Sequence, residues 1–182
     1  MKNFTELELP PFALDYIEWG DQTQIGITTT SDAPDDTNMA CGSLKYDWSK
    51  KVYENGQTIV PLRETELKEQ DFNTVCSLFR GTALETVYDM LNERYKIGRV
   101  RLMKSLPFTC LSWHTDSQIR IHYPVKTQEG CFMVIDDEIA HLKQDTWYLT
   151  NTMLKHTAFN SSKEDRVHLV VNVLNDYAEL SA

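Results

Sequence analysis

The chain has 182 residues, of which 41% are hydrophobic and 25% charged, and a formal net charge of −9. These values fit a single globular domain with one hydrophobic core. The acidic balance and the lack of a Lys/Arg cluster argue against a nucleic-acid partner, because phosphate binding needs clustered positive charge.

Localisation is indicated by what the sequence lacks. No apolar stretch approaches the length of a membrane span, and the first ten residues have no apolar segment typical of a secretory signal. The four cysteines are widely spaced without a CxxC pair, which is typical of reduced intracellular thiols. We therefore expect a cytoplasmic protein with no membrane partner.

Residues 1–98 are expected to form a helical and partly irregular support for the rest of the domain. Residues 1–42 are rich in turn-forming residues, which indicates irregular or edge structure. A strand is predicted over residues 44–53, followed by a turn at Asn55-Gly56 and a further β-prone segment over residues 58–62.

Helices are predicted in two segments of this N-terminal part. Leu84, Val87, Tyr88 and Leu91 follow the i, i+3, i+4, i+7 spacing of a buried helix face, which predicts a helix over residues 82–95. A weaker helical pattern covers residues 66–79.

From residue 99 onward the pattern changes to short alternating runs interrupted by turn signals such as Pro107, Pro124 and Gly130. Regularly spaced short strands of this kind indicate a β-sandwich or barrel. We therefore expect one mainly β domain over residues 1–182, with residues 99–182 as its barrel core.

Three residues of this core have the side chains of a metal site. His114 and Asp116 are two residues apart, so on a strand they point to the same face, and His156 follows forty residues later. Two imidazoles and one carboxylate form the facial triad that holds non-haem iron(II) with open coordination positions. Alone, either histidine is better explained as a satisfied residue near the core.

The last strand strengthens the functional interpretation. In the segment from Arg166 to Val173, valines and leucine occupy one face, while Arg166, His168 and Asn172 share the other with Val170. Arg120 and His122 repeat this arrangement. A small barrel lines its interior with one face of each strand, so these polar groups are predicted to face a ligand. A buried arginine can hold a carboxylate by two parallel hydrogen bonds.

These residues carry a family resemblance. The stretch from Arg99 to Val173 resembles the iron(II)- and 2-oxoglutarate-dependent oxygenases of the aspartyl/asparaginyl β-hydroxylase type and their bacterial free-amino-acid hydroxylase relatives. The matching segments are Trp113-His-Thr-Asp116, Arg120-Ile-His122, Trp147-Tyr-Leu-Thr-Asn151, His156-Thr-Ala-Phe-Asn160 and Asp165-Arg166-Val-His-Leu-Val-Val. Several members have glycine where this chain has Asp116, so it is similar to the members with the full triad.

The resemblance implies a double-stranded β-helix, the jelly-roll or cupin-like barrel. It implies that His114, Asp116 and His156 hold Fe(II) and that Arg166 binds the distal carboxylate of the co-substrate 2-oxoglutarate. Arg120 and His122 are then expected near the co-substrate. Two further candidates for substrate contacts are His168 and Asn160.

The expected activity is hydroxylation of a C–H bond by O₂ in a small carboxylate-bearing substrate, such as a free amino acid or an Asp/Asn-type residue. The surplus positive charge predicted inside the barrel favours a substrate with a negative group. Two alternatives remain: a cupin-like metal enzyme that does not use 2-oxoglutarate, and a non-enzymatic jelly-roll binding protein.

Overall fold

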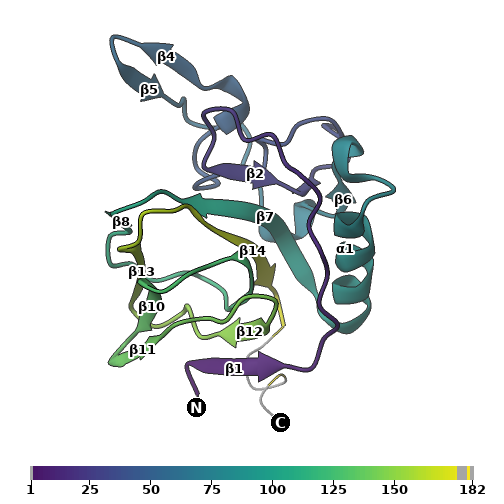
Figure 1. Ribbon diagram of the computed structural model, residues 1–182. Helices are drawn as coiled ribbons and strands as arrows, with labels where there is room; N and C mark the ends of the chain where they lie inside the picture. The colour runs from purple at the N-terminus through teal and green to yellow at the C-terminus, as the bar shows by residue number, and fades with distance from the viewer. Residues whose placement is uncertain (1, 176–179, 181–182) are drawn as a thin grey trace.

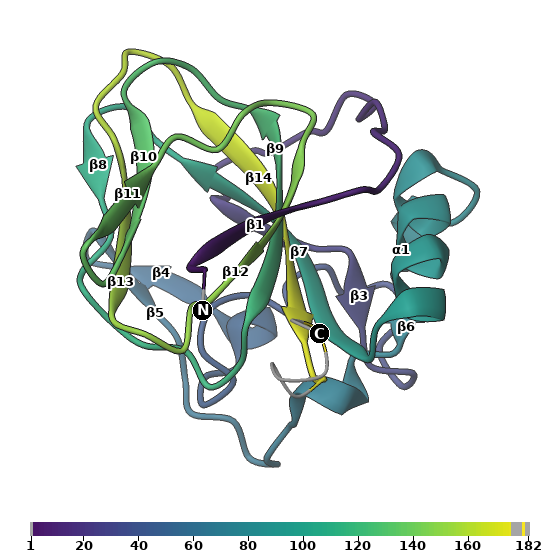
Figure 2. The ribbon, with the colours of Figure 1, turned by 90° about the horizontal axis from the view of Figure 1, so that it is seen from below.

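The computed structural model describes residues 2–175 and 180 of the chain. Two antiparallel β-sheets face each other and enclose a barrel interior, and an α-helix lies outside it (Figures 1 and 2). The six-stranded sheet has the order β1 (Phe4–Leu7), β12 (Trp147–Thr150), β9 (Arg120–Lys126), β14 (Arg166–Val173), β7 (Ile97–Ser105) and β2 (Gln24–Gly26). The four-stranded sheet has the order β11 (Glu138–Ala140), β10 (Cys131–Ile135), β13 (His156–Asn160) and β8 (Thr109–Cys110).

The path of the chain between these sheets identifies a jelly roll. From β7 to β14 the chain crosses repeatedly from one sheet to the other, so that β9, β12 and β14 join the first sheet and β8, β10 and β13 the second. Such alternation winds two strands around a common barrel. The mainly β jelly-roll prediction is therefore confirmed, and the expected edge structure before residue 42 supplies β1 and β2 at the two edges of the larger sheet.

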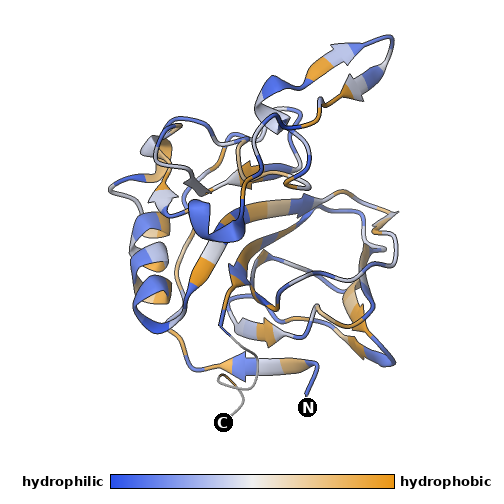
Figure 3. Ribbon diagram, turned by 180° about the vertical axis from the view of Figure 1, so that it is seen from behind, coloured by the Kyte–Doolittle hydropathy of each residue, from blue (hydrophilic) through white to orange (hydrophobic). Residues whose placement is uncertain are grey.

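The outer face of the larger sheet forms the main hydrophobic core together with the helix. Val167, Leu169, Val171 and Val173 of β14 belong to one buried cluster with Leu84, Val87, Tyr88 and Leu91 of α1 (Ala83–Arg94). Thr82 caps the helix by accepting a hydrogen bond from the Leu84 amide. The prediction of a helix over residues 82–95 is confirmed. Along α1 hydrophobic and hydrophilic residues alternate, as an amphipathic helix requires (Figure 3).

The predicted helical character of the N-terminal part is wrong apart from α1. Residues 66–79 form two short 3₁₀ helices (Glu69–Asp71 and Ser77–Phe79) separated by β6 (Thr74–Val75), which pairs with β3 (Thr28–Thr29). The buried residues Phe72, Val75, Cys76 and Phe79 have helical spacing by coincidence. Only the part between the two 3₁₀ helices is extended, because it pairs with β3 and because the Cys76 amide donates to the Ile27 carbonyl.

The predicted strand over residues 44–53 is also largely wrong. Residues 44–45 are in a turn, Tyr46 makes an isolated bridge and Trp48–Lys50 form a 3₁₀ turn, so the strand β4 is limited to Val52–Glu54. Asn55 and Gly56 both have positive φ, and they connect β4 to β5 (Gln57–Ile59) in the hairpin that the Asn-Gly pair predicts. This hairpin projects from the molecule (Figure 1). No helix among the described residues is long and apolar enough to cross a membrane.

Candidate metal centre

Two histidines from segments distant in sequence are held opposite each other by their own backbones. The His114 amide donates to the His156 carbonyl at 3.0 Å, and the His156 amide donates to the His114 carbonyl at 2.8 Å. His156 is the first residue of β13. His114 lies in the loop between β8 and β9 and pairs with His156 as an isolated β-bridge. The ring centroids are consequently only 4.2 Å apart.

Asp116 completes the cluster from the same side. Its amide donates to the Thr152 carbonyl at 2.9 Å, which fixes the segment after His114. One ligand atom from each of His114, Asp116 and His156 lies within 4.8 Å of the others. The structure thus brings together the three residues predicted from the sequence, although His114 and Asp116 lie on a bridged loop rather than on a regular strand.

The hydrogen bonds of the two imidazoles leave the correct nitrogens available to a metal. His114 Nδ1 donates to the Ser112 carbonyl at 2.7 Å, and His156 Nδ1 donates to the Leu154 carbonyl at 2.9 Å. A carbonyl oxygen can only accept, so each Nδ1 carries the proton and each Nε2 presents a lone pair. Such backbone contacts are typical of metal-binding histidines, because they fix the tautomer and the ring orientation.

One carboxylate oxygen in this cluster is buried without a partner among the described residues that would balance its negative charge. Asp116 Oδ2 is buried, lies 3.3 Å from His156 Nε2 and has no hydrogen-bond partner in the described part of the chain. Two electron-pair donors that face each other at this distance repel unless a cation lies between them. The nitrogen and carboxylate donors therefore fit a divalent metal of the kind bound by facial triads.

Arg120 holds the other oxygen of this carboxylate. Its guanidinium donates to Asp116 Oδ1 at 2.6 Å. Burial alone would raise the pKa of Asp116, but the net shift is downward, and the charge of Arg120 contributes to this lowering. The carboxyl is thus kept ionised and oriented. The structure gives Arg120 this carboxylate as its partner, so its predicted place at the co-substrate has no support from the geometry.

Two further histidines face each other deeper in the barrel. His122 of β9 and His168 of β14 lie with their Nδ1 atoms 3.4 Å apart, and neither Nε2 has a hydrogen-bond partner within the described ranges. Burial, and then the charges of Arg120 and Arg166, lower the pKa of His122 well below 6.5, while burial and Arg166 do the same for His168. Both imidazoles are therefore neutral at pH 7.

Arg166 lies at the beginning of β14 on the same face as His168. Its side chain is buried, and its Nε has no hydrogen-bond partner among the described residues. Burial lowers the pKa of this guanidinium. An uncompensated buried cation is costly, so this position is suited to an anionic ligand.

Asn160 does not have the freedom that a substrate contact needs. Its Nδ2 donates to the carbonyls of Ser105, Leu106 and Glu164, and its Oδ1 accepts from Ser162 and from the Cys131 thiol. These bonds join β13 to the surrounding loops. The predicted substrate contact is therefore corrected to a structural role by the hydrogen bonds that the residue makes.

One buried arginine near the centre was missed in the sequence. Arg101 of β7 is 3% exposed, and its register partner is Val170 of β14, so it shares the inner face with His168 and Asn172. The segment Arg99-Val-Arg-Leu alternates as Arg120-Ile-His does, and that alternation was the available signal. A charged face on a strand is otherwise typical of solvent exposure.

The family of this chain is identified by its similarity to known proteins. The sequence profile of the aspartyl/asparaginyl beta-hydroxylase family matches residues 28–176. No match was found among curated protein sequences. Among solved structures, an oxidoreductase of the 2OG-Fe(II) oxygenase family from Burkholderia pseudomallei is 17% identical with a TM-score of 0.41. The superposition covers 68% of this chain and 71% of the Burkholderia chain.

Two cupin structures show similarly weak likeness. A cupin domain from Bordetella pertussis is 16% identical with a TM-score of 0.38, covering 42% of this chain and 81% of its own. A cupin-2 domain protein from Shewanella frigidimarina is 12% identical with a TM-score of 0.35, covering 53% and 97%. The profile match, which spans most of the chain, is decisive. The chain belongs to the aspartyl/asparaginyl β-hydroxylase family, and it is an oxygenase.

Proposed function

We propose that this oxygenase uses iron(II) and 2-oxoglutarate to hydroxylate a C–H bond of a small carboxylate-bearing substrate. The observation that carries this proposal is that a cluster of three potential metal ligands shares the barrel interior with a buried arginine whose Nε has no hydrogen-bond partner among the described residues. His114, Asp116 and His156 supply the cluster, and Arg166 supplies the arginine. The products are succinate, CO₂ and the hydroxylated substrate, which account for both oxygen atoms of O₂.

The metal ligands and the two arginines near them have different roles in the proposed reaction. His114, Asp116 and His156 hold iron(II), which when bound supplies the activation of O₂. Asp116 stays ionised and fixed because Arg120 holds its second oxygen. Arg166 binds the distal carboxylate of 2-oxoglutarate through the planar fork of its guanidinium, which a lysine cannot reproduce.

The substrate class follows from the charge inside the barrel. The inner face has two buried arginines (Arg101 and Arg166) and the partly buried Arg120, for which the structure supplies Asp116 as an acidic partner. The neutral pair His122 and His168 adds no compensating charge. A bound co-substrate offsets one cation, and a substrate with a carboxylate offsets another. Free amino acids and Asp- or Asn-containing peptides are therefore the expected substrates, with O₂ as the other reactant.

The test is a screen for substrate-stimulated succinate formation. The iron-loaded protein with 2-oxoglutarate is supplied in turn with each proteinogenic amino acid and with short peptides containing Asp or Asn. We expect at least one carboxylate-bearing compound to increase succinate above the unstimulated rate. Stimulation only by neutral lipids or nucleosides would contradict the substrate class, and a complete absence of 2-oxoglutarate turnover would contradict the reaction.

A further inference from the structure

Two arginines two residues apart on β7 have opposite environments. Arg99 has partners for its whole guanidinium: Nε and Nη2 donate to Glu69 at 3.0 and 2.8 Å, and Nη1 donates to the carbonyls of Ala40 and Gly42. Both charged side chains of this pair are nearly inaccessible to solvent. The pair joins the segment before β7 to the strand, so Arg99 is a structural residue.

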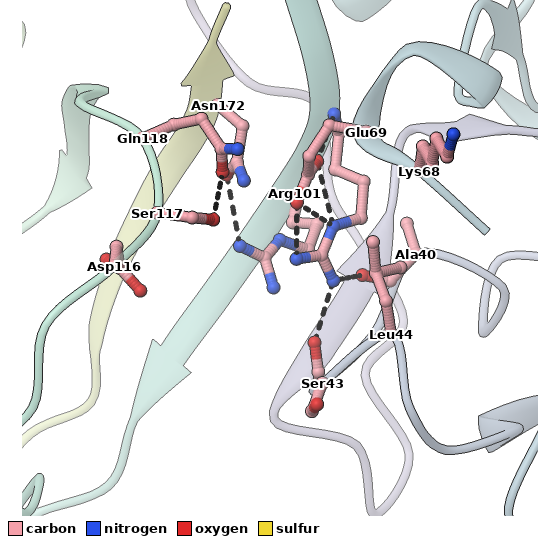
Figure 4. Close-up of polar contacts among 12 residues, drawn as sticks. Ala40, Ser43, Leu44, Lys68, Glu69, Arg101, Asp116, Ser117, Gln118 and Asn172 are labelled. Atoms are coloured by element: carbon pink, nitrogen blue, oxygen red, sulfur yellow. Dashed lines mark hydrogen bonds and ion pairs between the residues drawn. The ribbon is translucent and has the colours of Figure 1, made fainter. Parts of the chain in front are cut away.

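Arg101 has almost none of these partners. Within the described residues its single hydrogen bond is from Nη2 to Asn172 Oδ1 at 3.3 Å, and its Nε has none. Figure 4 shows its guanidinium between Asn172 and Glu69, with the contact to Asn172 as its one dashed line. Burial and the like charges of Arg99 and Arg120 lower its pKa. Glu69, the carboxylate whose charge raises the pKa of Arg101, already forms an ion pair with Arg99.

The position of Arg101 relates it to the metal centre. Asn172, its one partner, is paired in register with Arg120, the residue that holds Asp116. Arg166 lies at the opposite end of the same inner face, six residues from Asn172, or roughly 20 Å along the strand at about 3.3 Å per residue. Among the described residues, Arg101 at one end of the interior and Arg166 at the other have no carboxylate partner, and Asp116 is linked to the Arg101 end.

We propose that Arg101 and Asn172 bind the carboxylate of the substrate, while Arg166 is left to 2-oxoglutarate. The identification of the bound anion as the substrate rests on the proposed function, whereas the anion site itself does not depend on it. Asn172 Oδ1 accepts from Arg101, so its amide nitrogen remains to donate to the same anion. Arg120 is excluded from this role because Asp116 already holds its guanidinium.

A binding role and a structural role predict stability changes of opposite sign. A cation kept for a ligand destabilises the free protein, so its removal stabilises the fold, whereas removal of one partner of a buried ion pair destabilises it. We expect Arg101→Met to leave the thermal midpoint of the metal-free protein unchanged or raised. The matched control Arg99→Met, on the same strand, leaves Glu69 unpaired and is expected to lower the midpoint by roughly 6 °C or more.

Anion binding gives the second readout, again without iron. Acetate and the proteinogenic amino acids are added separately to the metal-free wild-type, Arg101→Met and Arg166→Met proteins, with sulfate as a tetrahedral comparison. We expect a carboxylate to raise the wild-type midpoint, and this rise to persist in Arg166→Met but to need at least tenfold more ligand in Arg101→Met.

Each other outcome overturns the proposal. A midpoint that falls in Arg101→Met as far as in Arg99→Met makes Arg101 structural. A carboxylate response that is absent, or is lost only in Arg166→Met, removes the second anion site, and a response to sulfate alone contradicts the carboxylate assignment. Failure of the proposed function is separate: it appears as an absence of succinate formation by the iron-loaded wild-type protein, whatever the midpoints show.

Discussion

The two faces of β14 have different roles: the outer face contributes to stability, and the inner face to the candidate site. Val167, Leu169, Val171 and Val173 on the outer face are packed against the helix, whereas Arg166, His168 and Asn172 on the inner face line the barrel. All eight residues of the strand are buried, so burial does not distinguish the faces. They differ in whether buried groups have partners: the outer side chains fill the core, and several inner nitrogens have no hydrogen bond within the described structure.

This comparison teaches how the fold can tolerate a costly site. A polar group without a partner in the interior destabilises a protein, and the well-packed opposite face compensates for it. We infer that substitutions on the outer face change stability with little effect on ligands, and that substitutions on the inner face do the reverse. The predictions below test this division in order of decreasing effect.

The largest effect is expected at the metal cluster. His156→Ala removes one of three ligands, and we expect it to abolish retention of iron(II) while the protein still unfolds cooperatively. Metal content after gel filtration and a thermal melt of the same sample measure the two properties. Stoichiometric iron in this variant would remove His156 from the site.

A large loss of stability is expected on the outer face. Leu169 is fully buried in the core cluster, and Leu169→Ala is expected to lower the free energy of unfolding by about 2–5 kcal/mol through lost burial and a cavity. Urea unfolding measures this change, and iron retention in the folded fraction is expected to stay at the wild-type level. A loss of iron without a loss of stability would reverse the roles of the two faces.

A change confined to binding is expected at Arg166. Arg166→Lys keeps the charge but not the two-pronged contact, so the apparent KM for 2-oxoglutarate should rise about tenfold or more, equivalent to about 1.4 kcal/mol. Steady-state succinate formation measures the KM. The matched control is Lys104→Arg on β7, whose ammonium lies 4.8 Å from the centre of the Trp19 ring outside the metal cluster, and it is expected to leave the KM unchanged.

The smallest effect is a pH dependence of stability. His122 and His168 have folded-state pKa values well below 6.5, so the unfolded chain binds more protons than the folded one as the pH falls. Their contribution is complete above about pH 6.5 and declines below it, by under about 1 kcal/mol for each histidine at pH 6. The double variant His122→Gln/His168→Gln should show a shallower decline in urea unfolding between pH 7 and 6. An identical slope would mean that these imidazoles are protonated in the folded protein.

The sequence predicted the inner site better than the support around it. The alternation after Arg166 is a local pattern, and it persists in β14. His114 and Asp116 come together with His156 although they lie on a loop, not on the strand that their spacing suggested. Residues 66–79 were mispredicted because Phe72, Val75, Cys76 and Phe79 have helical spacing. The middle of the segment instead pairs with residues distant in sequence, as the Cys76 amide does with the Ile27 carbonyl.

The environments of Arg101 and Arg120 could not be predicted from the sequence for a related reason. Whether a strand arginine is solvated, paired or left without a partner depends on which segments cover it, and no local pattern contains that information. Arg99 and Arg101 look alike in the sequence, yet Glu69 lies beside only one of them. The Asp116 contact of Arg120 likewise depends on the loop after His114.

The most direct test of the central claim is an anaerobic titration followed by visible absorption. Iron(II) and 2-oxoglutarate are added separately and then together to the wild-type protein and to His156→Ala. We predict a metal-to-ligand charge-transfer band in the wild-type protein only when both are present, saturating at one iron per chain, and no band in the variant. Tight iron binding without a band on addition of 2-oxoglutarate, or a band that survives in His156→Ala, would contradict the account.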